Sequence, residues 1–250
     1  MADFDNRLAR GATTAAATYD AGLRAHMLRV YNYMTGALAL TGLVAYGVAN
    51  TPALLALFYH EVMTASGVSM APTILGYVVV FAPLALIFFL GFRINQMSQG
   101  AAQLTFWAYA ALVGASLASL FIFYTGASIA LTFFVTAATF GTMSLYGYTT
   151  SRDLTGVGNF LFMGLIGIII ASLANMFFQS AAITFMISVL GVLIFTGLTA
   201  WDTQKIKQTY YAVGGDSAAA GKAAIMGALS LYLDFLNIFL FLLRFMGNRR

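Results

Sequence analysis

The sequence contains no cysteine and few charged residues. Without cysteine the chain cannot form disulfide bonds, thiol nucleophiles or thiolate metal sites. Only 8% of the 250 residues are charged, whereas a soluble domain carries about 25% because its surface must face water. So few charges cannot cover a globule of this size. Most of the protein surface is therefore expected to face lipid.

Motifs typical of enzymes are missing as well. The chain has no phosphate-binding glycine loop, no nucleophile-elbow serine and only two histidines, His26 and His60, without metal-ligand spacing. We therefore expect no catalytic residue, no enzymatic activity and no resident cofactor. The net charge of +4 is assigned to membrane orientation rather than to nucleic-acid binding, because basic residues fix the topology of membrane proteins.

Long apolar stretches make up most of the chain, which is 61% hydrophobic with a mean hydropathy of +0.86. A membrane-spanning helix needs about 20 apolar residues in a row, whereas barrel strands alternate polar and apolar residues over about ten. The unbroken stretches favour helices. We predict an all-α polytopic membrane protein, a bundle of seven transmembrane helices at residues 28–49, 73–93, 102–124, 127–149, 157–178, 182–204 and 223–246.

Two regions are expected along the chain. Residues 1–25 form a cytoplasmic amino-terminal tail, largely disordered, and residues 26–250 form the seven-helix transmembrane domain. The tail is polar, charged and rich in alanine, so it does not resemble a cleavable signal peptide. The longer connections are 51–72, where His60 and Glu61 should face water, and 208–221.

The basic residues predict the orientation. A cytoplasmic amino terminus leaves the three outside loops without any lysine or arginine, and it places these basic residues inside: Arg7, Arg10, Arg24, Arg29, Arg93, Arg152, Lys205, Lys207 and Lys222. Arg249 and Arg250 do not fit, because seven spans put the carboxyl terminus outside. We expect a full last span, with a re-entrant last helix as the alternative.

Two acidic residues fall inside predicted spans. Asp202 lies near the cytoplasmic end of the sixth span, and Asp234 lies near the middle of the seventh. An ionised side chain at the bilayer centre costs roughly 2.5 kcal/mol or more. The last span carries a polar stripe at alternating steps of three and four residues, namely Gly227, Ser230, Asp234, Asn237, Phe241 and Arg244. We expect the stripe to face a wet interior, which makes the last helix central and Ser230 and Asn237 pore-lining.

Two neighbouring carboxylates can share a proton, and when deprotonated they suit a hard cation such as Ca²⁺. The spacing therefore predicts a proton-sensitive cation site at Asp202 and Asp234, with calcium as the candidate ion. The alternative is that each acid bonds separately to a polar neighbour and only holds helices together. Arg93 ends the second span, where an arginine commonly extends to the membrane interface. Its alternative role is counter-ion to Asp202.

Two segments resemble the Bax inhibitor-1 family. Trp201-Asp202-Thr203-Gln204-Lys205-Ile206-Lys207 is similar to the aspartate motif that closes the sixth helix of that family. Residues 231–247, LYLDFLNIFLFLLRFMG, resemble its last helix, and the likeness covers roughly residues 20–247. The resemblance implies a bacterial inner-membrane protein with the last helix central and a pH-sensitive Ca²⁺ leak. In that scheme Asp202 and Asp234 sense protons and gate the pore, and Arg93 is the latch that pairs with the first acid.

Three hypotheses on function follow. The preferred one is a passive, proton-gated cation leak whose partners are the lipid bilayer, calcium ions and protons. The second is a non-conducting regulator that binds a membrane protease or another quality-control partner through its helices and tail, since a bacterial relative binds such a protease. The third is a cation/proton antiporter, although the sequence shows no broken helices in paired halves.

Overall fold

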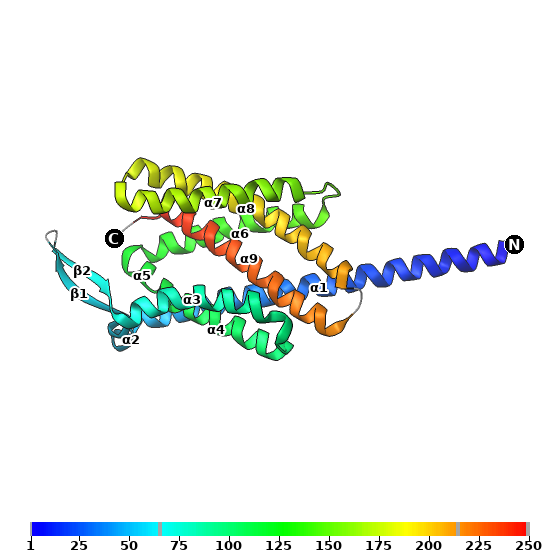
Figure 1. Ribbon diagram of the computed structural model, residues 1–250, viewed down its shortest axis with the longest axis horizontal. Coiled ribbons are helices and arrows are strands. Elements are labelled where there is room, and N and C mark those ends of the chain that lie inside the picture. Colours follow the sequence, from blue (N-terminus) through cyan, green and yellow to red (C-terminus); the bar gives the residue numbers. More distant parts are fainter. Residues whose placement is uncertain (1, 65–66, 214–215, 249–250) are drawn as a thin grey trace.

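The computed structural model describes residues 2–64, 67–213 and 216–248, with side chains from residue 21 onward except 64 and 67–69. Helices and one hairpin make up its described part (Figure 1). In chain order the elements are α1 (Ala2–Asn50), α2 (Pro52–Phe58), β1 (Tyr59–Thr64), β2 (Gly67–Pro72), α3 (Ile74–Arg93), the 3₁₀ helix η1 (Ile94–Gln96), α4 (Gln99–Leu117), α5 (Ser119–Phe123), α6 (Gly126–Thr149), α7 (Thr155–Phe178), α8 (Ala181–Val213) and α9 (Ser217–Met246).

Within the described residues, six segments are long and apolar enough to cross a membrane: α3 with η1, α4 with α5, α6, α7, α8 and α9. A seventh is formed if residues 21–50 of α1 are counted together with α2, which is bent from it by 99°. The bend falls at Thr51, whose backbone is extended, because the ring of Pro52 disfavours a helical conformation in the preceding residue. The predicted all-α polytopic membrane fold is confirmed.

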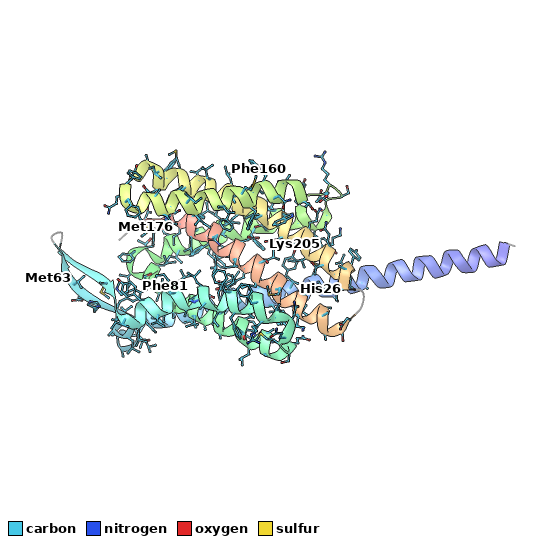
Figure 2. The ribbon with its side chains drawn as sticks, viewed as in Figure 1. His26, Met63, Phe81, Phe160, Met176 and Lys205 are labelled. Carbon is cyan, nitrogen blue, oxygen red and sulfur yellow. The ribbon has the colours of Figure 1, made fainter. Side chains whose placement is uncertain are left out.

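The last helix lies at the centre of the bundle, as predicted. α9 crosses it diagonally (Figure 1), and α8, α1, α6 and α4 pack around it. Its Leu231, Tyr232 and Ile238 are fully buried. α7 lies at the periphery, packed on α8, and most of its side chains are exposed, as Phe160 is with 69% exposure (Figure 2).

The amino-terminal segment continues the first helix. α1 is helical from Ala2, and its first part projects well beyond the bundle (Figure 1). The sequence favours a mostly disordered or weakly helical tail at residues 1–25, and its separate cytoplasmic character stays a prediction. The segment is rich in alanine, the strongest helix former. The packed part of α1 is already helical, so adding residues to its amino-terminal end does not require a new helix nucleus.

The connection at residues 51–72 holds α2 and an antiparallel hairpin that the sequence did not predict. Tyr59 pairs with Pro72 at its base, and His60 and Glu61 are exposed on β1. Two helix ends also differ, since α8 continues to Val213 and α9 begins at Ser217. Arg249 and Arg250 lie outside the described residues.

Candidate functional site

The polar stripe of α9 lines a cavity between α7, α8 and α9 with a volume of about 810 Å³. The residues of α9 that line the cavity are Ser230, Leu233, Asp234, Asn237, Phe241 and Arg244. The alternating steps of three and four residues keep most of these side chains on one face of the helix. α7 supplies an apolar wall that includes Ile168 and Met176. Ser230 and Asn237 line this cavity, and their role in a pore stays a prediction.

Asp202 and Asp234 meet on the wall of this cavity. They come from α8 and α9, which pack against each other, and their carboxyl groups face each other closely enough to share a proton. Asp234 is only 3% exposed, and no N–H or O–H donor of the described residues reaches its Oδ2 atom. The group that faces Asp234 is therefore another carboxyl group. This geometry differs from the alternative in which each acid has its own separate polar partner.

The cation beside Asp202 is Lys205. It lies three residues further along α8, close enough to act electrostatically on the Asp202 carboxyl group. Its Nζ atom sits 5.0 Å from the centre of the Trp201 ring, and Figure 2 places it where α8 runs beside α9. Sequence reasoning missed this neighbour, although a spacing of three on a helix was a usable signal.

Arg93 does not pair with Asp202 in this structure. Its side chain is exposed, and Nη1 donates a 2.6 Å hydrogen bond to Gln96 Oε1. The physical reason is the position of α3, which packs on α4 and on the short elements α2, η1 and β2 rather than beside α8. The latch pairing expected from the family resemblance is therefore not formed here, and the interfacial alternative describes Arg93 better.

Arg244 stands at the opposite end of the cavity from Lys205. The same side chain borders a second hollow of about 540 Å³, which is lined by Asn175, Thr184 and Ser188. Asn175 Nδ2 donates to Thr184 Oγ1 at 2.8 Å, and its Oδ1 accepts from the backbone N–H of Ser180 at 3.0 Å. Arg244 therefore borders both hollows. Its place in the sequence, near the end of a span, did not indicate this.

The remaining charged and titratable candidates do not join the site. His60 and Glu61 are exposed on the hairpin, and Asp153 lies in the connection between α6 and α7. The hydroxyl and backbone N–H groups of Thr155 both donate to Asp153 and lower the pKa of its carboxyl group. Within the described residues no three His, Cys, Asp or Glu side chains gather as a metal-binding group.

The comparisons with known proteins agree on one group of membrane proteins. Residues 23–250 match the protein family described as "Inhibitor of apoptosis-promoting Bax1". The chain is 47% identical over 231 residues to "Inner membrane protein YbhL" of Escherichia coli (strain K12), which covers 92% of this chain and 94% of that protein. Uncharacterised proteins of Rickettsia prowazekii and Caulobacter vibrioides are 49% and 47% identical over 252 residues, with both chains covered completely.

Proposed function

This integral membrane protein belongs to the Inhibitor of apoptosis-promoting Bax1 family, and from that premise we propose that it is a passive, pH-sensitive cation leak with Ca²⁺ as the conducted ion. It would act in the bacterial inner membrane with its amino terminus in the cytoplasm. The observation that carries the proposal is the pair Asp202 and Asp234, which face each other on the wall of the cavity between α7, α8 and α9.

The chemistry of the pair supplies the proton sensitivity. Two carboxyl groups form a hydrogen bond only when one of them carries a proton, because a carboxylate has no hydrogen to donate. When that proton leaves, two negative charges face each other, and charges about 4 Å apart repel by roughly 4 kcal/mol at an effective dielectric constant of about 20. The repulsion is relieved if α8 and α9 separate at this point or if a cation enters between the carboxylates. Proton loss and cation entry are thereby coupled.

The residues around the pair suit a passing cation better than a resident one. Asn237 donates through Nδ2 to the carbonyl oxygen of Leu233 at 2.8 Å, so its Oδ1 stays available as a ligand, and Ser230 adds a hydroxyl oxygen to the wall. A firmly held Ca²⁺ takes six to eight oxygen ligands, whereas two carboxylates, an amide, a hydroxyl and water make a weak site. Conduction requires such weak binding, because the ion must also leave.

The test is Ca²⁺ flux into proteoliposomes that contain the full chain, measured over a pH series. Asp202→Asn and Asp234→Asn should each flatten the dependence of flux on pH, because an amide cannot exchange the shared proton. Glu61→Gln is the matched control, since this acid is exposed on the hairpin and should keep the wild-type profile. If both aspartate variants keep the wild-type profile, the pair does not gate. Flux driven uphill by a proton gradient would instead indicate an antiporter.

A second function is favoured by the projecting part of α1 (Figure 1). A helix that extends beyond the bundle offers a surface to a membrane protease or another quality-control partner, and the protein would then be a regulator that conducts nothing. A variant without residues 1–20 separates the two, because Leu23 is the first buried residue of α1 that the structure describes. The leak predicts unchanged flux in this variant. The regulator predicts lost partner binding and no flux in either protein.

A further inference from the structure

A third hollow lies between α1 and α6. This α1–α6 groove has a volume of about 640 Å³, within the range of about 300–1,000 Å³ that small-molecule sites occupy. Its walls are Arg24, Met27, Leu28, Tyr31, Phe140, Gly141, Ser144, Leu145 and Tyr148. None of these residues lines the cavity that holds the acid pair.

The length of the groove matches one leaflet of a bilayer. Along α6 it extends from Phe140 to Tyr148, which at a rise of about 1.5 Å per residue is about 12 Å. Half of a hydrocarbon core about 30 Å thick is about 15 Å. Near the Phe140 end, a Cβ atom added to Gly141 would meet no atom within 4 Å, so this glycine opens onto unfilled space.

The polar side chains in the wall of the groove are hydrogen-bonded to other residues of the protein. Tyr31 Oη and Ser144 Oγ are 2.6 Å apart, and Ser144 Oγ lies 3.0 Å from Thr203 Oγ1. Thr203 in turn donates to the carbonyl oxygen of Thr199 at 2.7 Å. With its hydroxyl groups bonded to one another, the wall presents mainly hydrocarbon, and an apolar chain would bind without leaving these groups unpaired.

One end of the groove is basic. Arg24 is exposed at this end, and none of the described side chains forms an ion pair with it. Tyr148, at the same end, holds Lys207, whose Nζ donates to its carbonyl oxygen at 3.2 Å and lies 5.7 Å from its ring centre. The lining residues include no acid. Arg24 on the wall, with Lys207 held against Tyr148 of the same wall, gives this end a positive potential that suits an anionic lipid headgroup.

We propose that the α1–α6 groove is a binding site for an anionic phospholipid. One acyl chain lies along Leu28, Gly141 and Leu145, and the phosphate of the headgroup lies at the end formed by Arg24 and Tyr148. Charge complementarity selects this occupant over a zwitterionic lipid. The site does not rest on the proposed leak, because its walls and its charges are separate from the acid pair.

Native mass spectrometry of the purified full chain tests the site. The detergent-solubilised protein is titrated with phosphatidylglycerol and, separately, with phosphatidylcholine that has the same acyl chains. The wild type should retain one phosphatidylglycerol in preference to phosphatidylcholine. Arg24→Gln should weaken phosphatidylglycerol about fivefold and phosphatidylcholine hardly at all, because one basic residue near the surface contributes about that factor. Arg29→Gln, an exposed neighbour on α1 that does not line the groove, is the charge control.

A second test fills the α1–α6 groove with a larger side chain. Gly141→Leu should abolish retention of the lipid, whereas Gly167→Leu should not, because Gly167 opens onto space on α7 outside the groove. Both substitutions add the same side chain to an exposed helical position, so a difference in folding is not expected. Equal lipid retention by the two leucine variants would overturn the proposal. So would equal affinity of the wild type for the two lipids.

Discussion

The contact between α6 and α8 at Gly147 provides a test of the helix packing around the site. At Gly147, α6 touches the backbone of α8, and an added Cβ atom would stand 2.8 Å from both the Cα and the carbonyl carbon of Ala200 and still closer to its carbonyl oxygen. Backbone atoms cannot rotate away as a side chain does. Gly147→Ala must therefore push α6 and α8 apart.

The size of the effect follows from two opposing terms. Replacing glycine by alanine inside a helix gains about 1 kcal/mol of intrinsic helix stability. Overpacking by one carbon in a close-packed contact costs about 1–3 kcal/mol, and a backbone clash belongs at the upper end. The expected net loss is about 1–2 kcal/mol, or about 2–8 °C in the melting temperature of a chain of this size. Gly141→Ala on the same helix should instead gain up to about 1 kcal/mol, because its Cβ atom enters open space.

Thermal unfolding of both variants in the same detergent measures the difference. A lower melting temperature for Gly147→Ala together with an unchanged or higher one for Gly141→Ala supports the close contact of α6 with α8. Equal melting temperatures would refute it. Increased separation should also break the hydrogen bond between Ser144 and Thr203, since Ser144 lies one turn from Gly147.

Three further predictions concern charges and hydrogen bonds around the site. Gln204→Leu should destabilise the protein by about 1–3 kcal/mol in thermal unfolding, because Gln204 bonds two backbone groups of the α6–α7 connection, at 2.8 and 2.7 Å, that would be left unpaired. Lys205→Gln should move the pH midpoint of Ca²⁺ flux, whereas Arg93→Gln should leave it unchanged, since only Lys205 acts on the acid pair; equal midpoints in the two variants would contradict this. Thr155→Val should raise the pKa of Asp153, measured by NMR titration, because it removes one of the two hydrogen bonds that lower it. The stability from this lowered pKa is present above the unfolded pKa and is lost as pH falls through the folded one.

The membrane spans were predictable because lipid leaves few alternatives. A run of apolar residues in a bilayer must satisfy its backbone groups internally, so length and hydropathy alone indicate helices. Helix ends outside the apolar core lack this constraint. The segment after Gln204 contains two lysines, a glutamine and a threonine, yet α8 continues to Val213. Hydropathy marks only where the apolar segment ends. The alanine-rich start of α1 also lies outside the apolar core, so hydropathy does not decide whether it is helical.

The hairpin and the charged neighbours depend on tertiary structure. The strands beginning at Tyr59 and Gly67 are six residues each. The first, YHEVMT, does not alternate polar and apolar residues, so its pattern does not separate it from a loop. The spacing of the polar residues predicted the stripe of α9. The apolar wall from α7 was not predictable, because α7 is apolar on nearly every face and its sequence does not indicate which face packs inward. Arg93 was assigned from its place in a motif, whereas the packing of α3 on α4 decides where its side chain lies.

The shared proton between Asp202 and Asp234 is tested most directly by infrared spectroscopy of protonated carboxyl groups. The full chain in lipid nanodiscs is titrated with pH as wild type, Asp202→Asn and Asp234→Asn. A pair that shares one proton titrates as a unit, so each substitution should change the titration of the acid that remains. If each acid titrates in the variant as it does in the wild type, the two carboxyl groups are independent and the proposed proton sensor does not exist.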